Sequence, residues 1–228
     1  ATTLGMFSLA TVSESASTAT GSVGWTYTVN NSAAQYLAAG QSVNEVFTVE
    51  LDDGDGSTTT QAVTMTIAGA NDVVSITSSA PAAAITEDAV ASATGTILFT
   101  DADLTDAHTT SITSSNATTL GIFALAPVSE SATTAPGSVG WTYTLTNSSA
   151  QYLASGAQVV ETFTVTLNDG HGSTTSQVVS ITINGANDLV TITSAAQTGA
   201  VAEDGTLAAT GTVAFTDPDL ADGHTVSV

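Results

Sequence analysis

The sequence repeats itself with a period of 116 residues. The segment GSVGWTYTVN around Trp25 returns as GSVGWTYTLT around Trp141, and NDVVSIT from Asn71 returns as NDLVTIT from Asn187. Residues 1–112 align with residues 117–228 without a gap, and roughly two thirds of the aligned positions are identical, which is typical of a tandem array. A repeat of this length lies in the common size range of a domain. The period therefore predicts copies of one domain and not a single catalytic centre.

Asn-Asp pairs mark the predicted boundaries between repeats. On this frame residues 73–188 form one complete domain, residues 1–72 are the C-terminal part of a preceding repeat, and residues 189–228 are the N-terminal part of a following one. Because the frame begins and ends inside a repeat, we expect the natural polypeptide to be longer. Open sheet edges tend to pair with other chains, so a second hypothesis is that the two end pieces complete each other between molecules.

Short segments with alternating apolar and polar residues predict β-strands. Examples are TVAFT, GWTYTLT, ETFTVTL and QVVSITI, and ETFTVTLNDGHGSTTSQVVSITI predicts a hairpin that turns at Asn168, Asp169 and Gly170. Helical spacing occurs only in NSSAQYLASG and its copy, which are too short for more than a turn or two. Many short strands separated by Gly, Asn and Asp predict an all-β fold of tandem antiparallel β-sandwiches of the immunoglobulin type.

The charge is entirely acidic. The 228 residues include 21 Asp and Glu but no Lys or Arg, so the formal net charge is −21. Nucleic acids and anionic membrane surfaces are expected to be poor partners, because both are bound through basic side chains. No apolar run is long enough to predict insertion into a membrane, and without cysteine no disulfide can stabilise the domains. The carboxylates need another source of neutralisation: water, backbone N–H groups or metal ions.

The acidic residues recur in four groups per period. In the complete repeat these are Glu87 with Asp88, then Asp101, Asp103 and Asp106, then Asp169 in the hairpin turn, and finally Asp188. Several oxygen ligands without a basic partner suit calcium, which binds six to eight oxygens from carboxylates, carbonyls and water. Asp101 and Asp103, one residue apart at a strand end, favour a metal site, whereas Asp55 and Asp106 taken singly are typical solvated turn residues.

The remaining polar and aromatic residues predict no catalysis. The three histidines, His108, His171 and His224, are interpreted as polar turn residues. No nucleophile motif, zinc spacing or phosphate loop is present, so we expect the chain not to be an enzyme. Trp141 and Tyr143, like Trp25 and Tyr27, are two apart and are predicted to pack in the core. Tyr36 and Tyr152 are expected to plug the ends of the sandwiches. A lectin-like role for Trp141 and Tyr152 is a third hypothesis.

Two segments carry a resemblance to known domains. AITEDAVASATGTILFTDADLTD resembles the opening of a cadherin domain, with a Glu in the first strand, a Gly-Thr pair and an Asp-x-Asp element after the second strand. GWTYTLTNSSAQYLASGAQVVETFTVTLNDGHGSTTSQVVSITINGAND resembles a VCBS repeat, the cadherin-like extender module of large bacterial surface adhesins with RTX-type secretion. This resemblance covers the whole period twice.

The resemblance implies calcium at the joints between repeats. Carried over residue by residue, it implies one joint formed by Asn71, Asp72, Asp101, Asp103 and Asp169, and another formed by Glu87, Asn187, Asp188, Asp217 and Asp219. The linker lacks the longer acidic string of cadherins, so fewer ions per joint are expected. It also implies a secreted protein of the cell surface, whose calcium-stiffened repeats space an adhesive tip from the cell in adhesion or biofilm formation. The implied partners are neighbouring repeats of the same chain, or other copies in an extracellular filament.

Overall fold

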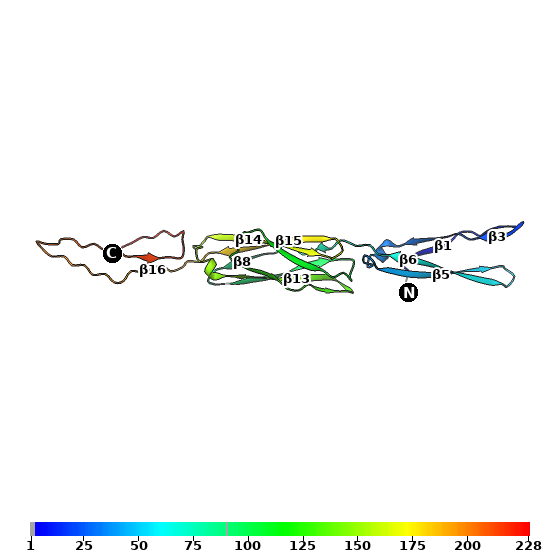
Figure 1. The fold of residues 1–228 in the computed structure, drawn as a ribbon, viewed down its shortest axis with the longest axis horizontal. Coiled ribbons are helices and arrows are strands. Elements are labelled where there is room, and N and C mark those ends of the chain that lie inside the picture. The colour runs from blue at the N-terminus through cyan, green and yellow to red at the C-terminus, as the bar shows by residue number, and fades with distance from the viewer. Residues whose placement is uncertain (1–2, 90) are drawn as a thin grey trace.

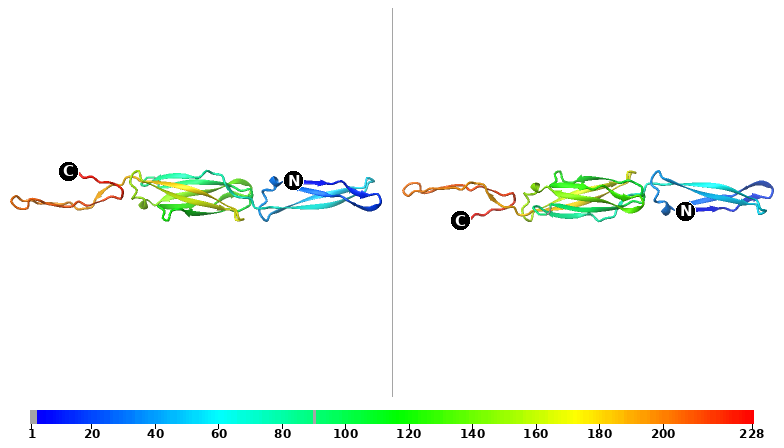
Figure 2. Two further views of the ribbon diagram at one scale, coloured as in Figure 1. Left: turned by 90° about the horizontal axis from the view of Figure 1, so that it is seen from above. Right: turned by 90° about the horizontal axis from the view of Figure 1, so that it is seen from below.

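The computed structural model describes residues 3–89 and 91–228, and nearly all its regular structure is β-strand, which confirms the predicted all-β class. Three units follow one another along one long axis: residues 3–68, a central β-sandwich, and residues 189–228 (Figure 1). The views from above and below show the same extended arrangement, with the central sandwich between the two end units (Figure 2).

The central sandwich consists of two sheets whose strands lie between Ser75 and Asn184. One sheet has the order β10 (Thr109–Ser114), β14 (Gln158–Asn168), β15 (Thr174–Asn184) and β8 (Ala82–Thr86). The other has the order β11 (Gly121–Leu125), β13 (Thr134–Leu145), β9 (Ser92–Thr100) and β7 (Ser75–Ile76), with β12 (Ser129–Ser131) also paired to β13. These pairings are antiparallel except for that of β8 with β15, which is parallel and aligns Ile85 with Ile183.

Period-two alternation places one face of each long strand in the core. Along β14 the residues Glu161, Phe163, Val165 and Leu167 are buried while their neighbours are partly or fully exposed. The main cluster also contains Trp141 and Tyr143 of β13, which are 3% and 0% exposed. The predicted hairpin is confirmed: β14 ends at Asn168, which pairs with Thr174, the first residue of β15.

The end units contain only part of this set of strands, and those strands lack most of the neighbours seen in the central sandwich. Residues 3–68 form three separate pairs, β1–β4, β2–β3 and β5–β6, and residues 189–228 form one pair, β16–β17. The bounds of these elements are β1 (Gly5–Leu9), β2 (Ser13–Ser15), β3 (Thr18–Ser22), β4 (Trp25–Val29), β5 (Ser42–Asp52), β6 (Thr58–Ala68), β16 (Thr191–Ile192) and β17 (Phe215–Thr216). Apolar faces that are covered in the central sandwich are consequently open in the end units.

The short helical segments form as predicted, but their tyrosines do not plug the sandwich. The segments are α1 (Asn31–Ala34) and the 3-10 turn η1 (Asn147–Ser149). Tyr152 remains 42% exposed, and the buried residues beside it are Ala150 and Leu153. The expectation for Tyr36 and Tyr152 is therefore wrong, because the apolar residues next to them in the turn fill that position. Trp25 also departs from its prediction, since it is 48% exposed where its copy Trp141 is buried.

Candidate metal centre at the joints between repeats

The acidic clusters lie where the chain passes from one unit to the next. The first joint combines the linker after β6, the loop after β9 and the β14–β15 turn, and contains Asn71, Asp72, Asp101, Asp103, Asp106 and Asp169. The second joint combines the turn after β8, the linker after β15 and the loop after β17, and contains Glu87, Asp88, Asn187, Asp188, Asp217 and Asp219. Each joint thus collects oxygens from segments far apart in the sequence.

The same hydrogen bond fixes the linker at both joints. The backbone N–H of Asp72 donates to Oδ2 of Asp103 over 2.7 Å, and the backbone N–H of Asp188 donates to Oδ2 of Asp219 over 2.8 Å. Asp103 is itself oriented by the Asp-x-Asp turn, in which its N–H donates to Oδ1 of Asp101 over 3.0 Å. The repeated geometry brings the linker carboxylate and the Asp-x-Asp element together in each joint.

In the first joint three buried carboxylates converge. Oxygens of Asp101, Asp106 and Asp169 all lie within 4.8 Å of one another. Asp169 comes from the hairpin turn, where its Oδ1 accepts the N–H groups of His171 and Ser173 at 2.8 and 3.0 Å. Its Oδ2 accepts the side-chain amide of Asn71 over 3.0 Å, so linker and hairpin are in direct contact. Like charges this close repel strongly unless a cation or protons neutralise them.

In the second joint the base of the central sandwich supplies its own carboxylates. Glu87 is only 1% exposed, and its oxygens accept the N–H of Ala186 at 3.0 Å and the side-chain amide of Gln151 at 3.3 Å. Asp88 adopts a left-handed backbone conformation with φ of 58°, which non-glycine residues rarely adopt. Hydrogen bonds from the side chains of Asn147 and Gln151 lower the pKa of Asp88, whereas burial and then the charge of Asp88 raise the pKa of Asp188.

Both joints contain buried oxygens without a hydrogen-bond donor. Within residues 3–89 and 91–228, five buried side-chain nitrogen or oxygen atoms lack a partner, and four of them are joint oxygens: Asn71 Oδ1, Asp103 Oδ1, Asp188 Oδ2 and Asp219 Oδ1. The fifth is the indole nitrogen of Trp141 in the core. Buried polar atoms are normally paired, and exceptions call for an unplaced water or ion. A water molecule could donate hydrogen bonds to at most two of these oxygens, whereas a cation could be bound by all the unpaired oxygens of one joint.

The pKa values of the joint carboxyl groups reflect this environment. Burial raises the pKa of Asp103, and nearby Asp106, Asp72 and Asp101 raise it further, against the hydrogen bond from the Asp72 backbone. Burial also raises the pKa of Glu87 and that of Asp188. For Asp169, burial acts upward, but hydrogen bonds from Asn71 and from its own turn outweigh it and lower the pKa. Asp103, Glu87 and Asp188 are therefore harder to ionise than ordinary carboxyl groups, and Asp169 is easier.

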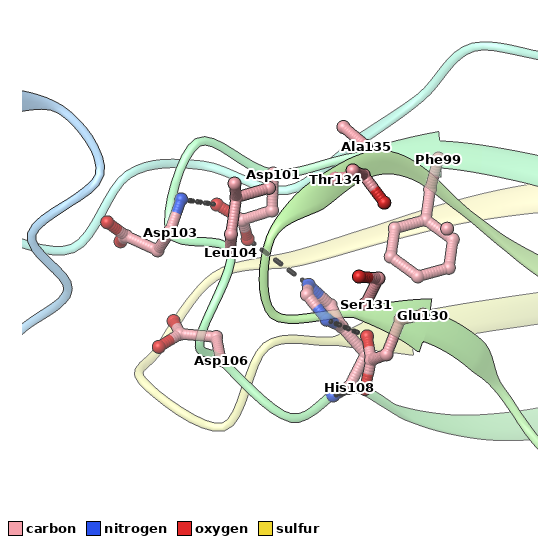
Figure 3. Close-up of a pocket in the computed structure, with 11 residues that line it drawn as sticks. Phe99, Asp101, Asp103, Leu104, Asp106, His108, Glu130, Ser131, Thr134 and Ala135 are labelled. Atoms are coloured by element: carbon pink, nitrogen blue, oxygen red, sulfur yellow. Dashed lines mark hydrogen bonds and ion pairs between the residues drawn. The ribbon is translucent and has the colours of Figure 1, made fainter.

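His108 corrects one interpretation made from the sequence. It is not a solvated turn residue: it is 8% exposed, and its ring lies between Oδ2 of Asp101 at 3.1 Å and Oε2 of Glu130 at 2.7 Å (Figure 3). His224 repeats the contact in the next repeat, with Asp217 Oδ2 at 2.8 Å. The sequence contained evidence for this Asp–His contact, because the spacing Asp-x6-His occurs in both copies of the repeat. A histidine here fixes the Asp101 carboxylate from the side away from the linker.

Two further joint residues were not predicted as ligands. Asp106 was interpreted as a solvated turn residue, yet it is 7% exposed and belongs to the carboxylate triad. Its Oδ2 accepts a hydrogen bond from His171 Nδ1 over 3.0 Å. Asp88 was grouped with Glu87 among the recurring acidic residues but was not assigned to a joint. In both cases the residue recurs in the other copy, as Asp222 and Asp204, which was the available clue.

The donor set fits calcium. The candidate ligands are carboxylate and amide oxygens from three segments per joint, and calcium takes six to eight such oxygens in a flexible arrangement. Magnesium requires a tighter octahedron and keeps several waters, and zinc favours nitrogen and sulfur. The joints present their oxygens on loops and turns, so small rearrangements can bring them to a cation.

No protein-family model and no curated protein sequence matches the chain. Among solved structures, the chain is similar to cadherin-like domains 1 to 4 of zebrafish RET, with a TM-score of 0.37, 11% identity and coverage of 64% of this chain and 34% of that one. It is also similar to domains 4–9 of the surface layer protein SbsC, with a TM-score of 0.33, 14% identity and coverage of 66% and 20%. The chain therefore spans about a third or less of these two structures, and a likeness this low assigns it no function.

Proposed function

We propose that this chain is an extender segment of a secreted bacterial cell-surface adhesin, in which calcium at the joints stiffens a row of β-sandwich repeats. Such a row would space an adhesive tip from the cell in adhesion or biofilm formation. The role is mechanical and not enzymatic. The observation that carries the proposal is the pair of joints at which buried carboxylate and amide oxygens converge without a donor, Asp103 and Asp219 above all.

The residues of each joint explain how stiffness would depend on a cation. In the first joint Asp72 belongs to the linker, Asp103 and Asp169 belong to the central sandwich, and their like charges favour separation of the two units. With a net charge of −21 and no Lys or Arg, the chain has no basic side chain to offset this repulsion. Bound calcium would supply positive charge and oxygen bonds on both sides of the joint, so that the linker loses its freedom to bend.

The arrangement of the units also supports an extender. The repeats follow one another along one axis, and entry and exit of the chain lie at opposite ends of the central sandwich (Figure 1). Each added repeat would therefore lengthen the molecule. No helix in the described part of the chain is long and apolar enough to cross a membrane. The lectin-like alternative is less favoured, because the Trp141 side chain is buried and has no exposed ring that could contact a sugar.

The proposal is tested by measuring calcium binding and molecular length on the 228-residue chain. We expect isothermal titration calorimetry to detect calcium binding at both joints, and small-angle scattering to give a longer, more rigid particle with calcium than with chelator. Asp103→Asn and Asp219→Asn should each weaken binding at one joint. The matched control is Asp52→Asn, which removes a charge from an exposed turn and introduces the residue that the other repeat has at Asn168. Absence of binding together with an unchanged length would refute the proposal.

A further inference from the structure

One side-chain hydrogen bond joins residues 3–68 directly to the central sandwich. The side-chain amide of Gln41 donates from Nε2 to Oγ1 of Thr105 over 2.9 Å. Gln41 lies in the loop before β5, and Thr105 lies in the loop after β9 that also holds joint carboxylates. Within the described residues 3–89 and 91–228, the other hydrogen bonds from residues before Val73 to the sandwich come from the linker residues Asn71 and Asp72.

The surroundings of Gln41 orient its side chain for this contact. Its backbone N–H donates to the carbonyl of Ala38, and its carbonyl accepts the N–H of Gly69, both over 2.9 Å. Its side-chain Oε1 accepts the N–H of Ala38 over 3.2 Å, which leaves the amide nitrogen to face Thr105. Because the amide is already held within its own unit, little side-chain entropy is lost when it binds Thr105.

Thr105 is held by the turn that carries the candidate calcium ligands. It lies between Asp103 and Asp106 in the sequence, and the N–H of Asp106 donates to the carbonyl of Asp103 over 2.9 Å. In the same turn the N–H of Leu104 donates to the carbonyl of Ala102 over 3.0 Å. The hydrogen bond to Thr105 therefore places this loop against the preceding unit without using a carboxylate.

The second joint has the same backbone at these positions but a different pair of side chains. The counterparts of Gln41 and Thr105 are Ala157 and Ala221. The two backbone hydrogen bonds of Gln41 recur at Ala157 with the same lengths of 2.9 Å, and the backbone bond of the turn around Thr105 recurs around Ala221 at 3.1 Å. Both members of the pair have thus changed together on one backbone frame, and two alanines cannot form a side-chain hydrogen bond.

We infer that the Gln41–Thr105 bond is a contact specific to the first joint, which keeps the two units together in the absence of a cation. The carboxylates of a joint repel one another unless they are neutralised, whereas an amide and a hydroxyl can bond across the joint without adding charge. The second joint, with Ala157 and Ala221, depends on its linker and on any bound ion. The residue pair at these two positions therefore distinguishes one joint from the other.

The strength of one hydrogen bond sets the size of the effect. A net hydrogen bond between neutral groups favours the closed joint, in which Gln41 contacts Thr105, about 2- to 10-fold over open ones. That bias shifts the orientation of the two units without fixing it. The bond needs no calcium, so it forms whether or not the joints bind the ion. Joints with two alanines at these positions should be the first to bend when cations are removed.

Single-molecule FRET on the 228-residue chain in chelator measures the ratio of closed to open first joints. The chain has no native cysteine, so the dyes can be attached at Thr28→Cys and Thr94→Cys, which are exposed positions in the two units. We expect Gln41→Ala to lower the ratio about 2- to 10-fold. Thr105→Ala should have the same effect. The double variant should be no worse than either single variant, because each substitution removes the same bond.

Gln61→Ala is the matched control. Gln61 is exposed on β6, and its Nε2 donates to the carbonyl of the adjacent Ala62 over 3.0 Å, so its loss should leave the ratio unchanged. An unchanged ratio in Gln41→Ala, an equal fall in Gln61→Ala, or additive effects in the double variant would overturn the inference. Because every measurement is made in chelator, a failure of the chain to bind calcium in calorimetry would refute the proposed function and leave this result standing.

Discussion

Asp103→Asn is expected to change the stability of the central sandwich in opposite directions with and without calcium. Asp103 is fully buried, its Oδ2 accepts the Asp72 N–H at 2.7 Å, and its Oδ1 has no donor. Asparagine keeps the shape, and its side-chain oxygen can take the place of Oδ2 as the acceptor of the Asp72 N–H. Its side-chain NH₂ replaces the unpaired oxygen and can donate to the neighbouring carboxylates of Asp101 or Asp106.

The magnitude follows from the linkage between binding and folding. Extracellular calcium modules have Kd values of about 0.1–1 mM. At a free calcium concentration of about 100 times Kd, one bound ion stabilises the folded state by about 2.7 kcal/mol. For a domain of this size each kcal/mol raises Tm by roughly 4 °C, so the native chain should gain on the order of 10 °C per ion. If the substitution weakens binding about 100-fold, the gain falls to about 0.4 kcal/mol.

Differential scanning calorimetry with calcium and with chelator measures both effects. In chelator we expect the Tm of Asp103→Asn to equal or exceed that of the native chain, because a buried charge among like charges has been removed. In calcium the order should reverse. If the substitution lowers Tm equally in both buffers, Asp103 is a structural hydrogen-bond acceptor and not a calcium ligand. Asp52→Asn should leave the calcium-induced rise in Tm unchanged.

Two more predictions concern buried acids. Burial raises the pKa of Glu87 and of Asp103 above their ordinary values, so in chelator the folded chain holds protons that the unfolded chain releases. The Tm of the chain in chelator, measured by circular dichroism, should therefore rise as the pH falls from about 7 to about 5. In calcium the Tm should instead fall as the pH falls, because protons compete with the ion for its carboxylate ligands. A Tm in chelator that falls with the pH would refute the raised pKa of these two acids. In the core, Tyr143 donates to Glu161 over 2.8 Å, so Tyr143→Phe leaves a buried carboxylate oxygen unpaired and should cost about 1–3 kcal/mol of unfolding free energy in urea titrations. Tyr27→Phe removes the equivalent bond in residues 3–68 and should leave the central transition unchanged; equal effects would mean that the two units unfold together.

The sequence was sufficient to predict the fold because the strand signal is local. Along β14 and β15, apolar and polar residues alternate because one face of each strand is buried, and this pattern can be recognised within each segment alone. The Asn-Asp-Gly sequence between them is typical of a hairpin turn. The parallel pairing of β8 with β15 was not predicted, since nothing in either segment specifies which distant strand lies beside it. The exposure of Trp25 was missed for the same reason: its cover comes from strands distant in sequence.

The joint was predicted in part. The structure brings Asn71, Asp72, Asp101, Asp103 and Asp169 together, and it places Glu87, Asn187, Asp188, Asp217 and Asp219 around the second linker; their role as calcium ligands stays a prediction. The buried positions of His108 and Asp106 were missed, because a polar residue in a loop has the same local signature whether it faces water or the interior. Recurrence between the copies was the one clue that distinguished them.

The parallel pairing of β8 with β15 has a consequence for a molecule under tension. β8 follows closely on the point where the chain enters the central sandwich, and β15 leads to the point where it leaves at the opposite end. Pulling the two ends apart therefore loads the five residue pairs from Ala82–Ser180 to Thr86–Asn184 in shear, all at once. A ladder loaded in shear must lose its hydrogen bonds together, whereas a hairpin pulled open from one end loses them singly. The repeat is thus built to resist force along the axis on which its neighbours lie.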